Sequence, residues 1–500
     1  MTRVLARVAL ALGTAAAVAA GPIGTGGPTV GTAAFAEAAG AGSADTMPPV
    51  RAKAMSEWSD ALALQAASWG APLVIMYNLR DNIALGAKPK APPGSLWRMT
   101  DISTPALSRE AGYVTPNVNT LYGFGFLDLG AEPQVLTLPD SHGRFYLVQL
   151  VDMWTNAFAY PAGAEKGYGG GKVAIVGPGW TGALPPGVAR IDAPTRWVLM
   201  QPRVHLKDEA DLAGARAVMD AIEVQGLSAV TGGTAPPAPA ADYPSPRLAD
   251  PGLPASALDF EDPLAFWDIL SRTLNENPPP PDQAAALMPM FAPLGLVLGE
   301  RWDRSKLDPV VLQAMAKAAK DAGPVLAHLP LGRVAEGWVI PPPTIGDFGT
   351  DYLTRAVVAR VGLTANTPKE AIYFYLETDS EGRMFSGEKT YSLTFKEMPP
   401  FVEPGFWSLT LYDLANNYTI DNPIDRYSLG SDDALVRAAD GSVTIIIQNA
   451  DPGGDATANW LPAPKGGFYL ILRAYAPGEA MIRSLSDPAA YAPPPAIAGP

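Results

Sequence analysis

Two aromatic, strand-like segments far apart in the chain constrain the fold most strongly. The first runs from Thr115 to Tyr160, and the second runs from Phe406 to Tyr427. Both alternate apolar residues with Asn, Gln, Asp, Arg and Tyr, whose polar groups are costly to bury unless they are paired. The two segments therefore predict two β-rich modules that present, or share, a polar site.

Composition narrows the class of protein. The 500 residues suffice for two or three domains, and 48% hydrophobic against 17% charged residues indicates a globular chain. A net charge of −14 argues against a nucleic-acid or anionic-membrane partner, because both need basic surfaces. The absence of cysteine excludes disulfides and thiolate metal sites. Only three histidines are present, dispersed along the chain, so we predict no histidine metal centre.

The N-terminus has the pattern of a secretory signal peptide, which we place at residues 1–38. Arg3 and Arg7 supply the basic start, and Val8 to Ala20 is an apolar run too short for a membrane span. No second long apolar run follows. We therefore expect a secreted, periplasmic or cell-envelope protein with no membrane span, and a flexible segment at residues 39–54.

Hydrophobic periodicity and turn residues predict the remaining organisation. We expect a mainly β fold with helices (α+β), in which two β-sandwich or barrel-like modules are joined by a helical region. Helices are predicted at residues 52–85, where Pro72 is expected to kink or divide the helix, and at 208–226. The predicted parts are an N-terminal β-rich domain at 55–230, a Pro/Ala-rich linker at 231–254, a helical connecting region at 255–376, and a jelly-roll-like β domain at 377–500.

Several motifs resemble known families. PNVNTLY, GRFYLVQLVD, TNAFAY and GPGW resemble domain-of-unknown-function family 1254. FWSLTLYD, DNPIDRYSLG, GSVTIIIQNADPG, ANWLPAP and FYLILRAYAP resemble the companion family 1214. The resemblance covers the chain from about residue 55 to its end, and it implies two β domains joined by helices, with export. It supplies no activity and no catalytic residues.

Polar residues of the first segment form two candidate groups. Asx turns after Pro116 explain Asn117 and Asn119, and the alternative is that these residues and Tyr122 offer amide and phenol groups for hydroxyl or carbonyl recognition. The second group contains Asp152 as a candidate general base, or as part of a structural network. Its other members, as candidate ligand-binding residues, are Arg144, Gln149 and Asn156.

The second segment adds Asp413 at the predicted end of a strand. Asp152 and Asp413, if they face each other across a cleft, could perform carboxylate acid–base hydrolysis. The other candidate binding residues there are Trp407, Tyr412, Asn422 and Arg426, although a structural turn clamp explains the last two.

A third group combines Trp460 and Asn459 with Arg473 and Tyr475 as candidate ligand contacts. Nearby, the segment DPGGDATAN (Asp451 to Asn459) has spaced carboxylates that suit Ca²⁺, but it lacks the spacing of an EF-hand. We predict no other metal and no cofactor.

These groups favour an exported protein that binds or hydrolyses a small polar molecule or glycan at an aromatic-lined polar site. A hydrolase is one interpretation. The alternative is a non-catalytic carbohydrate-binding or calcium-stabilised envelope protein. The sequence leaves open whether the chain forms a homo-oligomer.

Overall fold

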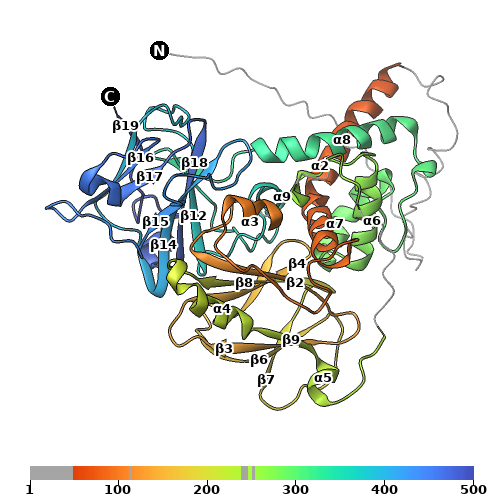
Figure 1. Ribbon diagram of the computed structural model, residues 1–500. Helices are drawn as coiled ribbons and strands as arrows, with labels where there is room; N and C mark the ends of the chain where they lie inside the picture. Colours follow the sequence, from red (N-terminus) through yellow and green to blue (C-terminus); the bar gives the residue numbers. More distant parts are fainter. Residues whose placement is uncertain (1–48, 112–114, 238–245, 251–253, 500) are drawn as a thin grey trace, which may run out of the picture. The chain divides into compact units, whose positions relative to one another are not determined.

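The structure is a computed structural model that describes residues 49–111, 115–237, 246–250 and 254–499. The chain divides into two units, residues 1–54 and residues 55–500. In the first unit, the described residues 49–54 are helical. The predicted signal peptide and most of the predicted flexible segment lie outside the described residues. All of the contacts below belong to the second unit (Figure 1).

The N-terminal half contains two sheets packed face to face. A five-stranded sheet has the order β1-β2-β8-β4-β5, and a four-stranded sheet has the order β7-β6-β3-β9. Their strands are β1 (Trp97–Arg98), β2 (Thr120–Asp128), β3 (Gln134–Asp140), β4 (Tyr146–Asp152), β5 (Ala157–Ala162), β6 (Gly169–Val176), β7 (Val188–Asp192), β8 (Trp197–His205) and β9 (Glu223–Gly226). Leu136 of β3, Ile175 of β6 and Leu199 of β8 share one hydrophobic core, so the two sheets bury each other.

Helices extend this same core. The long helix α2 (Pro49–Arg80) continues into a π-helical turn at Asp81–Leu85. Its last two turns are buried, and the helix continues through Pro72 as one element. The other helices of the core are α6 (Ala265–Glu276), α7 (Pro281–Phe291), α8 (Pro309–His328) and α9 (Tyr352–Val361). The short helices are α3 (Pro105–Ala111), α4 (Leu212–Asp220), α5 (Leu227–Thr231) and α10 (Glu479–Arg483).

The C-terminal half is a second two-sheet module. A six-stranded sheet has the order β10-β11-β12-β18-β14-β15, and a four-stranded sheet has the order β17-β16-β13-β19. Their strands are β10 (Arg333–Ala335), β11 (Trp338–Ile340), β12 (Ala371–Leu376), β13 (Tyr391–Phe395), β14 (Phe401–Asp413), β15 (Ser428–Gly430), β16 (Val443–Gln448), β17 (Trp460–Pro462), β18 (Phe468–Pro477) and β19 (Ile497–Ala498). Leu472 of β18 and Ile445 of β16 lie in one core, which makes the module a sandwich.

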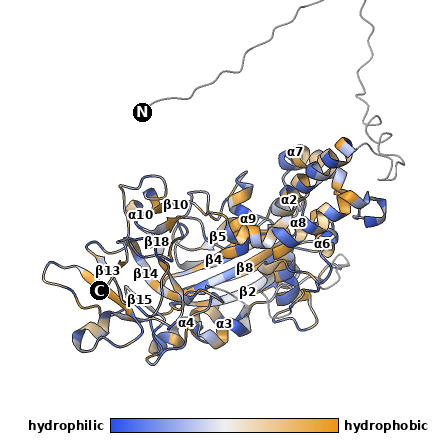
Figure 2. Ribbon diagram, turned by 90° about the horizontal axis from the view of Figure 1, so that it is seen from above, coloured by the Kyte–Doolittle hydropathy of each residue, from blue (hydrophilic) through white to orange (hydrophobic). Residues whose placement is uncertain are grey.

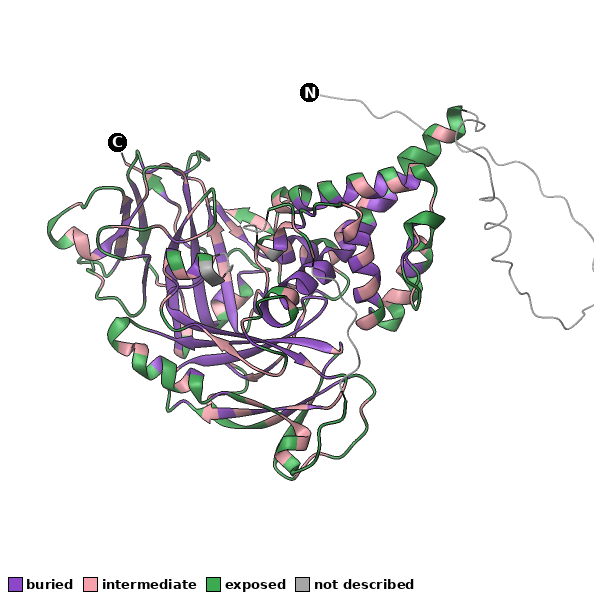
Figure 3. Ribbon diagram, turned by 45° about the vertical axis from the view of Figure 1, so that its right-hand side comes forward, coloured by how far each residue is buried: buried purple, intermediate pink, exposed green. Residues whose placement is uncertain are grey.

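Both faces of the six-stranded sheet are buried at its central strand β18. Leu470, Leu472 and Ala474 of β18 point into the sandwich core, and their neighbours Ile471, Arg473 and Tyr475 point to the other face, because side chains alternate along a strand. Figure 3 shows the central strands buried along their length, and β8 and β18 have no residue outside the buried class. Figure 2 shows that β2, β4 and β8 are not uniformly hydrophobic, so polar groups lie inside the molecule.

The α+β fold with two β-rich modules is confirmed, but some elements differ from the prediction. The predicted helix at 208–226 is shorter, because α4 ends at Asp220 and β9 begins at Glu223 to complete a sheet. Strands β10 and β11, which we placed in the helical connecting region, belong to the C-terminal sheet together with β12. Their short apolar runs are extended because they pair with one another and with β18. Within the described residues, no helix is both long and apolar enough to cross a membrane.

Candidate functional site: an arginine–tyrosine cluster between two sheets

The two halves meet where the polar face of the six-stranded C-terminal sheet covers β4, β5 and β8. Phe145 before β4 contacts Phe406 and Tyr475, with ring centroids 5.7 and 5.6 Å apart. Around this contact lies a set of buried polar side chains that we call the arginine–tyrosine cluster. Its members are Asn117, Tyr122, Gln149, Tyr160, Arg203, Asn366, Tyr373, Tyr412, Arg473 and Tyr475.

Arg473 is the central cation on the C-terminal side, and it is only 3% exposed. Its Nη1 donates to the Tyr412 hydroxyl at 2.7 Å, and its Nη2 donates to the Thr115 carbonyl at 2.7 Å. The ring of Tyr412 lies 5.4 Å from the guanidinium carbon. Within the described part of the chain, no carboxylate lies at ion-pair distance from Arg473. Its charge is therefore buried among neutral groups, an arrangement that is costly unless a counter-ion is present.

Arg203 of β8 is the second buried guanidinium, at 2% exposure. Its Nη1 donates to Gln149 Oε1 at 2.7 Å and to Asn366 Oδ1 at 3.0 Å. Its Nη2 donates to the Thr364 carbonyl at 2.9 Å. Burial raises the pKa of Tyr373 and Tyr475, and the charge of Arg203 partly offsets this rise in both, so the two halves of the cluster are electrostatically coupled.

The phenols of the cluster are protonated donors at neutral pH. Burial raises the pKa of Tyr373, Tyr412 and Tyr475 to about 12 each. The Tyr373 hydroxyl accepts a hydrogen bond from Asn366 Nδ2 at 2.5 Å, and the Tyr160 hydroxyl accepts one from the Thr367 amide at 3.0 Å. Since each of these oxygens already accepts a bond, its own proton remains to be donated.

The backbone around Asn117 fixes the N-terminal edge of the cluster. Tyr122 Oη accepts from the Asn117 amide, and Asn117 Oδ1 accepts from the Asn119 amide as an Asx turn. Asn119 Oδ1 then accepts from the Ser428 hydroxyl at 2.8 Å. Asn117 and Asn119 therefore form the predicted Asx turn, and their side chains also lie at a polar site.

The structure thus brings together five of the predicted site residues, and it places the others elsewhere. The converging residues are Asn117, Asn119, Tyr122, Gln149 and Tyr412. Arg203, Tyr373 and Asn366 were not predicted, and Arg473 and Tyr475 had been grouped with Trp460. The sequence does contain a signal for the residues on strands. Arg473 interrupts an otherwise apolar strand, and Tyr373, Arg473 and Tyr475 alternate with core residues.

Asp152 and Asp413 lie in separate hydrogen-bond groups. Asp152 Oδ1 accepts from the Trp154 and Asn156 amides, and Oδ2 accepts from Asn156 Nδ2. Asp413 Oδ1 accepts from the amides of the turn that follows it. Asp152 pairs with Val198 near the start of β8, whereas His205, which contacts the C-terminal sheet, ends the same strand. The rise along the strand alone therefore places Asp152 about 20 Å from the His205 end. This arrangement does not support a shared acid–base pair.

The remaining predicted residues have local structural partners. Arg144 makes a bidentate pair with Asp211, and Arg426 Nη1 donates to the carbonyls of Thr457 and Trp460. The Asn422 side chain closes the turn through the Arg426 amide and carbonyl. The buried Trp460 donates to the Gln448 carbonyl. Trp407 packs in the sandwich core against Phe395, so neither tryptophan offers an exposed ring for sugar stacking.

The predicted calcium loop is held by its own hydrogen bonds. Asp451 Oδ1 accepts from the Gly453 amide and from the Thr457 hydroxyl. Among the described residues, no group of three or more His, Asp or Glu side chains is placed to hold a metal ion.

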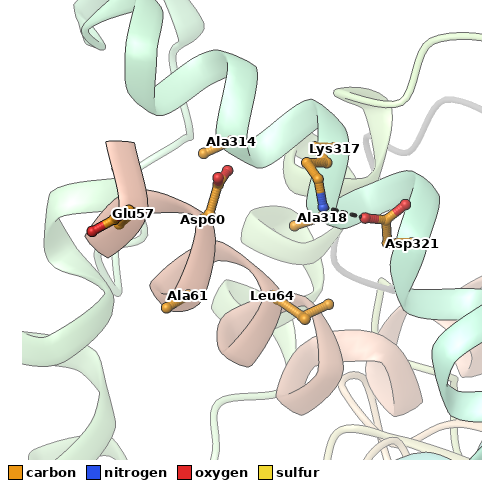
Figure 4. Close-up of a pocket in the computed structure, with 8 residues that line it drawn as sticks. All are labelled: Glu57, Asp60, Ala61, Leu64, Ala314, Lys317, Ala318 and Asp321. Atoms are coloured by element: carbon orange, nitrogen blue, oxygen red, sulfur yellow. Dashed lines mark hydrogen bonds and ion pairs between the residues drawn. The ribbon is translucent and has the colours of Figure 1, made fainter. Parts of the chain in front are cut away.

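A pocket of about 380 Å³ lies elsewhere, between α2 and α8 (Figure 4). On its α8 side, Lys317 pairs with Asp321 one helical turn away at 2.6 Å, and alanines of both helices form part of its wall. None of the predicted site residues lines this pocket.

Comparisons with known proteins agree with this two-part architecture. The family model described as protein of unknown function DUF1254 matches residues 96–226, and the one for DUF1214 matches residues 370–479. No curated protein matches the chain.

Two solved structures are similar to the chain. The crystal structure of the VPA0106 protein from Vibrio parahaemolyticus is 21% identical with a TM-score of 0.66, over 88% of this chain and all of that one. An uncharacterized protein from Burkholderia cenocepacia is 12% identical, with a TM-score of 0.38, over 89% of this chain and 96% of that one. The first similarity shows the fold alone. The DUF1254 match precedes the DUF1214 match, in the order that the motifs predict.

Proposed function

We propose that the protein binds a small anionic molecule, carrying a carboxylate, phosphate or sulfate group, at the arginine–tyrosine cluster. The observation that carries this proposal is the buried Arg473 guanidinium, which contacts a phenol and a carbonyl but no carboxylate among the described residues. An anion would supply the missing counter-charge, and a planar guanidinium binds such oxygens with two hydrogen bonds.

The surroundings of Arg473 support the same chemistry. The hydroxyls of Tyr160 and Tyr373 already accept hydrogen bonds and have protons to donate, and Arg203 adds a second positive charge. A ligand with several acceptor oxygens matches this excess of donors. The sequence predicts a small polar ligand at an aromatic-lined site, and the proposal specifies that this ligand is an anion. Hydrolysis is not part of the proposal.

Export remains part of the proposal. The basic start and the apolar run from Val8 to Ala20 support secretion into the periplasm or the cell envelope. Comparison of the N-terminal residue of the mature protein with Met1 tests this: an uncleaved Met1 on protein recovered from the cytoplasm contradicts it.

Binding is tested by titrating the purified protein with sulfate and with acetate, against chloride at equal ionic strength. We expect sulfate or acetate to raise the melting temperature and to give a binding isotherm by calorimetry. Tyr373→Phe removes one donor from the cluster and should weaken binding about tenfold, which corresponds to about 1.4 kcal/mol. The matched control is Tyr375→Phe on the same face of β12, whose hydroxyl contacts Glu377 instead.

Two results would overturn the proposal. One is a melting temperature that no anion raises beyond the effect of chloride. The other is equal binding by wild type, Tyr373→Phe and Arg473→Lys, with circular dichroism showing that all three are folded.

A further inference from the structure

A buried histidine, paired with an aspartate, lies beside the proposed anion site. His205, at the end of β8, is 5% exposed, and its Nε2 lies 2.8 Å from Asp432 Oδ2. Asp432 follows β15 in the C-terminal half, and its side chain is 19% exposed, so solvent reaches the pair. Among the three histidines, His142 is highly exposed and His328 bonds only to its own helix.

A stack of three rings connects this pair to the arginine–tyrosine cluster. The imidazole of His205 lies on the ring of Phe406 with centroids 3.9 Å apart and planes 8° apart. The ring of Tyr475 lies on Phe406 at 4.6 Å and 14°. One face of a phenyl ring holds only one parallel ring at these distances, so His205 and Tyr475 cover opposite faces of Phe406. Tyr475 in turn interacts electrostatically with Arg203 and Arg473.

We propose that His205 is a positioning residue for the anion site: it fixes Phe406, and through it Tyr475, and Asp432 holds the imidazole in place. This inference rests on the proposed function. Loss of the imidazole would leave one face of Phe406 without its stacked ring, so we expect Tyr475 to shift and anions to bind less tightly.

The other charged groups around His205 are already paired. Arg144 donates to the His205 carbonyl at 2.8 Å and is neutralised by a bidentate contact with Asp211. Asp433, next to Asp432, is exposed, and its carboxylate accepts from the Gly430 amide. Partial desolvation of the carboxyl raises the pKa of Asp433, and the contact with Arg144 lowers that of Asp211. Substitution of His205 therefore leaves these neighbouring contacts in place.

The test measures sulfate affinity at one fixed pH. We expect His205→Gln to weaken sulfate binding about fivefold, at the lower end of typical coupling between sites. The control His328→Gln, on an exposed helix end, should retain the wild-type affinity.

A second readout needs no ligand. In protein labelled with ¹³C-tyrosine, and with the signal assigned through Tyr475→Phe, the Tyr475 resonance of His205→Gln should differ from that of wild type at the same pH. Equal sulfate affinity of His205→Gln and wild type would overturn this inference and leave the proposed function intact. A wild type that binds neither sulfate nor acetate would overturn the proposed function. A Tyr475 resonance that is unchanged by the His205 substitution would overturn the positioning role directly.

Discussion

The Ser408 hydroxyl donates to the Asn117 carboxamide oxygen at 3.2 Å, and this contact joins residues 291 positions apart in the chain. It is one of several bonds by which the loop before β2 is attached to the C-terminal sheet. Tyr412 Oη donates to the Pro116 carbonyl, and Arg473 donates to the Thr115 carbonyl. The PNVN motif of the DUF1254 region is therefore completed by side chains of the DUF1214 region.

A double-mutant cycle measures this connection. Asn117 is fully buried, so Asn117→Ala should lower the free energy of unfolding by about 2 kcal/mol, and Ser408→Ala by about 1 kcal/mol. The double variant should lose less than the sum, by about 0.5–1.5 kcal/mol, because both substitutions remove the same bond. Urea denaturation gives these values. The exposed pair Thr394 and Thr444, whose hydroxyls lie 2.9 Å apart, is the control and should show coupling near zero.

The buried carboxyl of Asp152 should give stability a distinct pH dependence. Burial outweighs its hydrogen bonds and raises its pKa from 3.8 to about 6. A raised pKa in the folded state means that the carboxyl favours folding below pH 4, and that this contribution is lost as the pH rises to about 6. The loss amounts to about 3 kcal/mol.

Asp152→Asn removes this titration. The free energy of unfolding of the variant, compared with wild type by urea denaturation at several pH values, should improve between pH 4 and pH 6.5. Parallel profiles for the two proteins would show that Asp152 does not titrate in this range.

Arg355 is expected to control the titration of Asp152 from a distance. Its guanidinium lies 5.1 Å from the ring centroids of both Trp154 and Tyr352, and its charge lowers the pKa of Asp152. Arg355→Met keeps much of the volume and removes the charge, so the pKa of Asp152 should rise above 6. The ¹³C resonance of the Asp152 carboxyl measures the change. Arg360→Met, on the same helix with a contact to the Gly323 carbonyl, should leave that resonance unmoved.

The sequence predicts the parts of this fold better than their assembly. Periodicity identifies strands such as FYLILRAYAP, and motif order identifies the two family regions. Periodicity also predicts which side chains of β18 share a face, but it does not predict which part of the chain covers the face that carries Arg473 and Tyr475. Arg473 belongs with Tyr412 and Asn117 only because β14, β18 and the loop before β2 meet in space. Asp152 and Asp413 both end strands, and nothing local distinguishes a turn-capping carboxylate from one that faces a cleft.

A glycine pair tests how tightly the turn after β5 is attached to the C-terminal half. Glu370, with no exposed surface, accepts hydrogen bonds from the Ala164 and Glu165 amides at 2.7 and 3.2 Å. A Cβ added to Gly163 would lie 2.3 Å from Glu370 Oε2, whereas one added to Gly167 meets nothing within 4 Å. Both glycines have positive φ, so alanine at either position costs about 1 kcal/mol in backbone strain.

The Gly163→Ala variant should therefore lose about 2 kcal/mol more than Gly167→Ala, since the carboxylate must move away from the two amides it binds. Urea denaturation measures both values. Addition of Glu370→Ala to Gly163→Ala removes the collision, so the extra cost of Gly163→Ala should disappear in the Glu370→Ala background. Equal costs for the two glycines in the wild-type background would mean that the turn shifts freely, and that Glu370 does not hold it.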